Sequence, residues 1–491
     1  MIFTSSRKAE LVVTVFLVTF LGVNALFNAF FGFSLALYLG AIPLSVGLAF
    51  FFPRAGLIAA TIVTILFERF FTLEPLIIGL GAYKLYPLDI ILATVLLSGL
   101  LIWLREGRAF VRLRPFDFLL IIFFVLISVL FFAIARDNHA VPLAVAFSTW
   151  KNYLFYGALI FFVAGAVRSK QDVLDLTKLL GYGLLAASSF FWIGVMRGGG
   201  LWTEYTPLST AGTRFLAFPH AFYFSLGLLV LFLSLPLWYE KVKKEQRLLL
   251  MLWTLVLVTG IALSLMRHLW LGLTATLLVA IAFSPYIYGR ALLGYVGRFI
   301  FPLVSILVTF FVFLTIVPMS STSLKFSQGL SVIQERFISI GNQYDESLAW
   351  RGKVWQSTWT HFQDNPLIGI GFGVSVPVEL GDYHEFVEVR NMHNSWLALL
   401  VQTGVIGTLL FLGYLVMLLA SFWRLVLTDD TLRQARLVLS GLVFFQALVF
   451  FSQPYLETNL LCLFFWLTIG IIRAIIEFGT KIELHETSVI V

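Results

Sequence analysis

Two arginines and one histidine in this sequence combine reactive side chains with positions beside long apolar runs. Arg267, in SLMRHLWLG, separates two such runs with hardly any loop, and Arg214, in GTRFLAFPH, precedes another. We expect both guanidinium groups at a membrane boundary, where a diphosphate head group would lie. A guanidinium forms paired hydrogen bonds to phosphate oxygens and its charge does not titrate. The alternative is an arginine that only reaches toward lipid head groups.

His393, in RNMHNSW, directly precedes a long apolar run and therefore stands at the start of an expected membrane helix. An imidazole titrates near neutral pH, so it could accept a proton from a sugar hydroxyl as a general base. The alternative is a histidine that only hydrogen-bonds at the membrane interface. In that reading Asn394 or Ser395 caps the helix.

The composition shows which elements must position these residues. The chain has 491 residues, of which 60% are hydrophobic and 12% charged, whereas soluble proteins carry roughly twice that charged fraction. A helix of about 20 apolar residues spans a bilayer because it satisfies its own backbone hydrogen bonds. We predict an all-α polytopic membrane protein of about 12–14 transmembrane helices, forming one domain over residues 1–491. The predicted segments are 10–31, 33–52, 55–71, 86–104, 116–135, 152–168, 178–196, 218–238, 248–266, 269–287, 299–318, 396–423, 437–452 and 458–476.

The basic residues between these segments predict the orientation of the chain, because short cytoplasmic loops collect Lys and Arg. The clusters fall on one side if every segment crosses once, which places both termini in the cytoplasm. They comprise Arg7 and Lys8, Arg54, Arg105 to Arg114, Arg168 and Lys170, Lys241 to Arg247, Arg290 and Arg298, Arg424 to Arg436, and Lys481. Six of the seven histidines, all except His485, then lie on or near the outer face. We therefore expect an outward-facing site.

The longest polar stretch, residues 320–395, is predicted to be a partly helical extracytoplasmic insert. Its tryptophans at 350, 355 and 359, together with Phe362, favour an amphipathic helix. The segment DNPLIGIGFG then ends that helix, because it contains Pro366 and three glycines at alternating positions. We expect this insert to fold over the membrane surface and to carry His393 at its end.

Several other classes of protein do not fit the sequence. The net charge of +7 arises from clusters between apolar runs, so no nucleic acid partner is predicted. There is one cysteine, Cys462, and no HExxH pair, so no metal site is predicted. GIGFG lacks the spacing of a nucleotide fingerprint. Charged residues at the ends of the third and fourth segments favour a stabilising ion pair over a catalytic carboxylate; they are Glu68, Arg69, Lys84 and Asp89.

Three motifs together resemble the bacterial O-antigen ligase and polymerase superfamily. They are GTRFLAFPHAFYFSLG, SLMRHLWLG and a composite that runs from RGKVWQSTWTHFQDNPLIGIGFG to MHNSWLALLVQTGVIG. The composite is the most specific, because an Arg-started helix leads to an NPLxGxGxG turn, an HNxxL segment and a GxxG pair. The resemblance covers about residues 200–415. Family members usually have Ser before the arginine of the second motif and Asn after the proline of the first, where this chain has Met266 and His220.

The resemblance implies an inverting, metal-independent glycosyltransferase of the C-type membrane class that needs no cofactor. Its donor would be an undecaprenyl-diphosphate-linked glycan, and its acceptor a glycan or the lipid A core. By motif, Arg214 and Arg267 would bind the diphosphate leaving group and His393 would be the base. Arg351, Asn394 and His268 would support them. Arg197 could take the role of Arg214.

The same resemblance implies a multi-pass protein of the bacterial inner membrane with its active site facing the periplasm. It leaves open a ligase, a polymerase and a transferase onto another surface polymer. A different reading is a transporter or flippase of lipid-linked oligosaccharide. Transporters commonly contain internal repeats and interrupted helices near the membrane midplane, and the sequence indicates neither.

Overall fold

The computed structural model describes residues 7–31, 34–72, 76–78, 83–106, 111–137, 143–197, 218–288, 294, 297–298, 346–380 and 383–489. These residues form fifteen α-helices and two short β-hairpins. The chain divides into two compact units. Unit one comprises Met1–Leu180, Glu346–Val426 and Phe450–Val491, and unit two comprises Gly181–Asp345 and Leu427–Val449.

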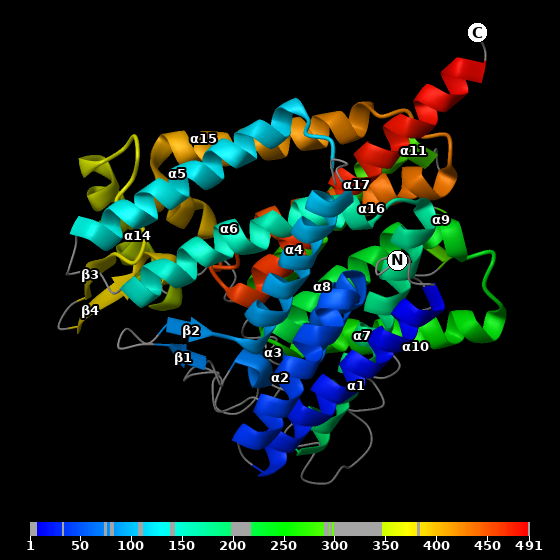
Figure 1. Cartoon of the computed structure of the whole chain (residues 1–491), viewed down its shortest axis with the longest axis horizontal. Helices are drawn as coiled ribbons and strands as arrows, with labels where there is room; N and C mark the ends of the chain where they lie inside the picture. Colours follow the sequence, from blue (N-terminus) through cyan, green and yellow to red (C-terminus); the bar gives the residue numbers. More distant parts are fainter. Residues whose placement is uncertain are drawn as a thin grey trace. The chain divides into compact units, whose positions relative to one another are not determined.

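Unit one contains the two ends of the chain and the long polar insert. Within it, α5 and α15 lie side by side, and so do α6 and α17 (Figure 1). Its helices are α1 (Arg7–Phe31), α2 (Leu35–Phe51), α3 (Pro53–Thr72), α4 (Pro87–Glu106), α5 (Pro115–Asp137), α6 (Leu143–Ala166), the start of α7 (Lys170–Arg197), α14 (Glu346–Asp364), α15 (Ser395–Arg424) and α17 (Asn459–Val489). Its strands are β1 (Leu76–Ile78), β2 (Tyr83–Leu85), β3 (Ser375–Leu380) and β4 (Tyr383–Glu388).

Unit two contains the rest of α7 and a group of helices that pack on α8 and α16. These helices are α8 (Phe218–Leu233), α9 (Leu235–Trp238), α10 (Lys244–Leu263), α11 (Arg267–Tyr288) and α16 (Asp430–Val449). A Cβ atom at Gly272 of α11 would lie 2.9 Å from Val449 of α16, so the glycine permits a close approach of these two helices.

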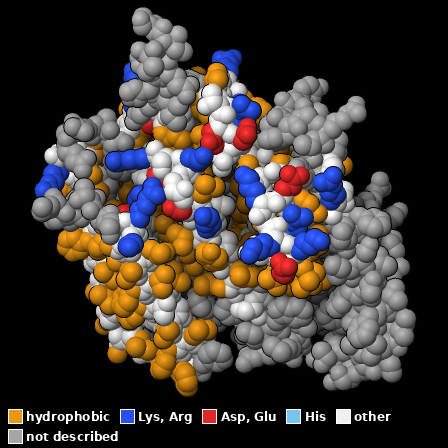
Figure 2. Space-filling model, turned by 90° about the vertical axis from the view of Figure 1, so that its right-hand side faces the viewer, with side chains coloured by type: hydrophobic (Ala, Val, Ile, Leu, Met, Phe, Trp, Pro, Cys, Tyr) orange, Lys and Arg blue, Asp and Glu red, His pale blue; other side chains and the backbone are white. Residues whose placement is uncertain are grey.

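The helices confirm an all-α polytopic membrane protein. Seven of the described helices are long and apolar enough to cross a membrane, and each predicted segment corresponds to a helix except 299–318, which lies outside the described residues. The count of about 12–14 crossings remains a prediction. On the face drawn in Figure 2, Lys and Arg side chains gather beside a large hydrophobic surface. This pattern is expected where membrane helices end at a lipid head-group layer.

Two membrane helices of unit one begin with the same sequence pattern, a proline followed two positions later by an aspartate. Helix α4 begins with the residues Pro-Leu-Asp and α5 with Pro-Phe-Asp, and proline is favoured at the first helical position because its missing N–H would have no partner there. Asp89 accepts a hydrogen bond from the backbone N–H of Tyr86 at 3.1 Å, and Asp117 accepts one from Arg114 at 2.7 Å. Each aspartate thereby satisfies an amide at the helix start.

Asp117 also forms a buried ion pair that ties α5 to α17. Arg473 of α17 donates to Asp117 at 2.9 Å and to Glu477 at 3.3 Å, and the Arg473 and Asp117 side chains are both fully buried. A buried charge is tolerated only when it is paired and hydrogen-bonded. This pair therefore fixes which helix lies beside α5 at that end of unit one.

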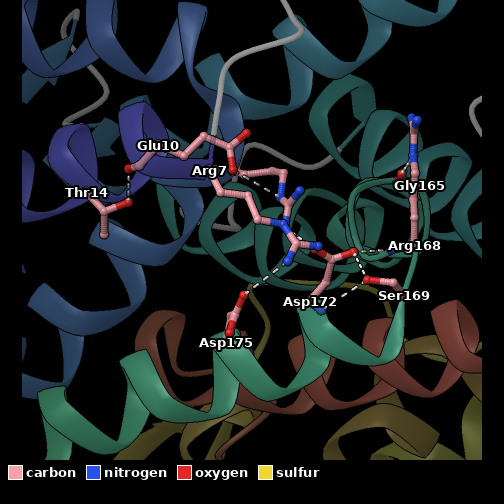
Figure 3. A network of polar contacts seen from close by, with 9 residues as sticks. Arg7, Glu10, Thr14, Gly165, Arg168, Ser169, Asp172 and Asp175 are labelled. Carbon is pink, nitrogen blue, oxygen red and sulfur yellow. Dashed lines mark hydrogen bonds and ion pairs between the residues drawn. The ribbon is translucent and has the colours of Figure 1, made fainter.

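A second polar network joins the starts of α1, α3 and α7 (Figure 3). Asp172 accepts hydrogen bonds from Arg54 at 2.9 Å and from the hydroxyl group of Ser169 at 2.8 Å, and Arg7 reaches it at 3.5 Å. Arg54 also pairs with Glu10 at 3.8 Å. Because the charges compensate each other, this network explains two of the basic positions, Arg7 and Arg54, as structural contacts.

The described part of the polar insert is folded. Helix α14 carries the predicted tryptophans and ends at Asp364, directly before the NPLIGIGFG turn. The hairpin of β3 and β4, whose strands have six residues each, packs on α14 (Figure 1) and was not predicted. A small core joins the two to the start of α15; its buried members are Val354, Phe362, Val376, Val378, Val387, Val389, Met392, Ala398 and Val401. Residues 320–345 of the predicted insert lie outside the described residues.

Helix α15 is interrupted at Gly404, where φ is 68° and ψ is −176°. The sequence indicated no interrupted helix, so this expectation is wrong. The NPLIGIGFG turn of the insert replaces the helical hydrogen bonds that are lost at Gly404. The backbone N–H groups of Ile370 and Gly371 donate to the carbonyls of residues 401 and 402, at 2.9 and 3.1 Å. Val405 and Ile406 in turn donate to residues 366 and 367, at 2.9 and 3.1 Å. The turn thereby supplies the partners that irregular backbone inside a membrane helix requires.

Candidate active site

His393 lies between the folded insert and α15, and its backbone has an uncommon conformation. It follows a 3-10 turn (Val389–Asn391) and the buried Met392, and its φ is 59°. Trp355 of α14 donates its indole N–H to the carbonyl oxygen of Met392 at 2.9 Å. This hydrogen bond fixes the backbone of the residue directly before His393. A non-glycine residue in this left-handed region is held there by its surroundings and is more frequent at functional sites.

The imidazole of His393 has two neighbours that fix its orientation. Its Nδ1 atom lies 2.9 Å from the Oε1 atom of Gln453. The ring of Trp350 stands edge-on to it, with 5.5 Å between ring centroids. Contacts on two sides leave the imidazole half-buried in a defined position.

The pKa of His393 is lowered from its ordinary value. Burial is the main cause, because it disfavours the charged imidazolium, and the positive charge of Arg351 on α14 lowers the pKa further. The hydrogen bond to Gln453 acts in the opposite direction but does not outweigh them. The imidazole is therefore neutral at pH 7, the form in which it can accept a proton.

Asn394 and Ser395 form the start of α15. The Asn394 side chain accepts a hydrogen bond from the backbone N–H of Leu397 at 3.1 Å, so Asn394 is the helix cap. Ser395 is fully buried and donates its hydroxyl to Glu457 at 2.6 Å. Asn394 therefore caps the helix, as the alternative reading of His393 expects, and the imidazole of His393 takes no part in capping.

The segment between α16 and α17, residues 450–458, supplies two residues to this region that sequence reasoning missed. Gln453 contacts His393, and the buried Glu457 accepts hydrogen bonds from Ser395 and from the Tyr153 hydroxyl, both at 2.6 Å. Burial raises the pKa of Glu457 to about 7, although these hydrogen bonds oppose the shift. The signal available in the sequence was a polar SQPYLETN segment between two apolar runs.

Asp89 has a partner other than those predicted. Its carboxylate pairs with Lys151 of α6 at 2.5 Å and accepts a hydrogen bond from the Tyr156 hydroxyl at 2.7 Å. Both charged side chains are almost completely buried. Asp89 therefore forms an ion pair with a lysine outside the predicted cluster, and an ion pair among the predicted residues stays a prediction. The side chains of Glu68, Arg69 and Lys84 lie outside those described.

Arg267 is the first residue of α11, in unit two. Helix α10 ends at Leu263, and the short link to α11 contains Leu265 with a φ of 60°. Trp270 donates its indole N–H to the carbonyl of Ile261 at 3.0 Å, which closes this helical hairpin. Arg267 and the neighbouring His268 are half-buried at the start of α11, where the backbone N–H groups of the first turn favour an anion.

The remaining predicted arginines are described in part. Arg351 lies in the first half of α14, where its charge acts on His393. Arg197 is the last residue of α7, and its side chain is not among those described; Arg214 lies outside the described residues altogether. Among the residues that the structure describes, no group of three His, Cys, Asp or Glu side chains could hold a metal ion.

The fold and the site define a class: a polytopic all-α membrane protein with a folded polar insert that holds a neutral histidine at the start of a membrane helix. Residues 248–412 match the family model described as O-antigen ligase. This match confirms the predicted resemblance to the O-antigen ligase and polymerase superfamily, and the matched residues include Arg267, Arg351 and His393. It supports a membrane glycosyltransferase of the ligase or polymerase type in a bacterial membrane. No curated protein matches the chain.

Proposed function

We propose that this protein transfers a glycan from an undecaprenyl-diphosphate-linked donor to a hydroxyl group of an acceptor, which is a second glycan or the lipid A core. The reaction takes place on the periplasmic side of the inner membrane, and both termini are cytoplasmic. The observation that carries the proposal is the environment of His393. Its imidazole is oriented by Gln453 and Trp350, is neutral at pH 7, and lies within the residues that match the O-antigen ligase family.

The proposed chemistry is one displacement at the anomeric carbon of the donor sugar. The acceptor oxygen forms the new bond to this carbon as its proton passes to His393. The bond between the carbon and the diphosphate oxygen breaks, and the lipid diphosphate leaves with the electron pair. Attack on the face opposite the leaving group inverts the anomeric configuration. A base for the hydroxyl and positive charge for the departing diphosphate are the two requirements of this step.

Arg267 supplies the positive charge in this proposal, with Arg214 or Arg197 beside the same diphosphate. A guanidinium at the start of α11 combines a permanent charge with the positive end of the helix dipole. Replacing it by lysine keeps the charge but loses the paired geometry. Arg267→Lys is therefore expected to retain part of the activity, and Arg267→Ala to bind the donor weakly.

The test is transfer by the purified protein in lipid vesicles that contain the lipid-linked glycan, with a glycan acceptor or lipid A core added separately. The glycan products are separated by size. Wild type should extend one of the acceptors, and His393→Ala should lose about 100-fold or more in rate. Full activity of a folded His393→Ala protein would show that His393 is not the base. Movement of an unaltered donor glycan across the vesicle membrane, with no transfer, would instead favour a flippase.

A further inference from the structure

The contact between His393 and Gln453 joins two distant parts of the chain. His393 ends the insert, whereas Gln453 lies 60 residues later, between α16 and α17. Their Nδ1 and Oε1 atoms are 2.9 Å apart, the distance of a direct hydrogen bond. The side chain of Gln453 is therefore in a position to determine which nitrogen of the imidazole carries the proton.

The chemical types of Nδ1 of His393 and Oε1 of Gln453 determine which nitrogen of the imidazole carries the proton. An amide oxygen only accepts hydrogen bonds, so Nδ1 must carry the hydrogen that it donates to Gln453. A neutral imidazole has one ring proton, and Nε2 is then left with a free lone pair. The nitrogen presented away from Gln453 is thus the basic one, as a general base requires.

The backbone that carries Gln453 is itself fixed at several points. The carbonyl of Phe450 accepts from the backbone N–H of Ser395 at 2.8 Å, and the hydroxyl oxygen of Ser395 lies 3.2 Å from the carbonyl oxygen of Gln453. Glu457, near the end of the same segment, binds Ser395 and Tyr153 through its two carboxylate oxygens. The segment is therefore attached to α15 and α6, and Gln453 is not a freely moving surface side chain.

We propose that Gln453 is a positioning residue for the transfer reaction: it orients the imidazole of His393 and holds the proton on Nδ1, so that Nε2 receives the proton of the acceptor hydroxyl. The inference rests on the proposed function. It assigns no contact with substrate to Gln453, and so predicts an effect on the chemical step rather than on donor binding. The hydrogen-bond partners that orient metal-bound histidines contribute about tenfold to 100-fold to activity, and we expect an effect of similar size here.

The test compares two variants of Gln453 in the vesicle transfer assay, with kcat, the donor KM and the pH dependence measured for each. Gln453→Ala should lower kcat about tenfold to 100-fold with little change in KM. Gln453→Glu keeps the size of the side chain but places a negative charge beside the imidazole, which raises the pKa of His393. The acidic limb of its pH profile should move up by about one to three pH units.

The charged group known to act on His393 from the packed elements is Arg351 of α14. Gln363, exposed on the same helix α14, gives the matched controls Gln363→Ala and Gln363→Glu, which should leave kcat and the pH profile unchanged. The thermal midpoint in detergent establishes that each variant folds.

Two results would overturn the inference, and they are distinguishable. If His393→Ala is inactive but Gln453→Ala keeps full kcat and Gln453→Glu leaves the acidic limb in place, His393 acts without positioning by Gln453. If a folded His393→Ala protein is fully active, the proposed function loses its base and the role of Gln453 is lost with it.

Discussion

Gly369 and Gly404 approach each other so closely that neither position has room for a side chain. A Cβ atom on Gly369 would lie 2.5 to 2.6 Å from backbone atoms of residues 401 to 404, and one on Gly404 would lie 2.2 Å from the carbonyl oxygen of Leu367. Both glycines also have positive φ angles, 76° and 68°. This contact joins the turn of the insert to the interrupted helix α15, and it explains why the composite motif has glycine at both positions.

Gly404→Ala is therefore expected to prevent this docking. The backbone conformation at Gly404 is one that only glycine adopts readily, and the new Cβ would meet backbone, which cannot move aside. The expected loss in the free energy of unfolding exceeds about 3 kcal/mol. Thermal unfolding in detergent measures it. Gly413→Ala in the same helix is the control, because its Cβ would lie 3.4 Å from Leu119. An equal effect of both substitutions would contradict this explanation.

The lowered pKa of His393 predicts the direction of the pH dependence. Transfer should fall as the pH decreases through the pKa of His393, below the ordinary value of 6.5, because the protonated imidazole cannot accept a proton. Arg351→Gln removes the positive charge that contributes to this lowering, so the acidic limb of kcat/KM should move toward higher pH. Lys353→Gln, exposed on the same helix, should leave the limb in place. A limb that does not move in Arg351→Gln would contradict the electrostatic role of Arg351.

Glu457 predicts a pH dependence of stability. Its pKa is raised from 4.5 to about 7 in the folded protein, so between these values the folded state holds a proton that the unfolded chain has lost. The stabilisation is fully present below pH 4.5 and is lost as the pH rises through about 7. This amounts to about 3 kcal/mol.

Thermal midpoints measured across this range should fall with pH in wild type and fall less in Glu457→Gln, which cannot ionise. Glu379→Gln is the control, because the Glu379 side chain is 77% exposed. Identical slopes in wild type and Glu457→Gln would show that Glu457 does not titrate in this range.

The Arg473 and Asp117 pair predicts a large effect of single substitutions. Arg473→Met leaves the buried Asp117 carboxylate without its partner and is expected to cost about 3–5 kcal/mol of stability. The double variant Asp117→Leu with Arg473→Met removes both charges and should recover much of that loss. Thermal unfolding of the single and double variants forms a double-mutant cycle.

Asp430→Asn serves as the control for the buried pair. Asp430 forms an ion pair with Arg433 at the surface, where the side chain of Asp430 is 83% exposed. Exposed pairs contribute little. A double variant as unstable as the sum of the two single variants would show that Arg473 and Asp117 are not energetically coupled.

The sequence by itself determined the local structure of this protein. Apolar runs long enough to span a bilayer became helices, because a membrane helix depends on its own residues for its hydrogen bonds. The Arg351 helix, its end before Pro366 and the glycine turn were predictable for the same reason, since each follows from neighbouring residues. The motif around His393 also indicated the resemblance to the O-antigen ligase family, whose model matches residues 248–412.

The tertiary structure alone decided which distant residues meet. Gln453 contacts His393 across 60 positions, Lys151 of α6 neutralises Asp89, and Glu457 is buried against Ser395. None of these pairs has a sequence spacing that predicts it, because each depends on how helices pack on one another. The interruption at Gly404 belongs to the same group: glycine permits the conformation, but the break is stable because the turn supplies its hydrogen bonds.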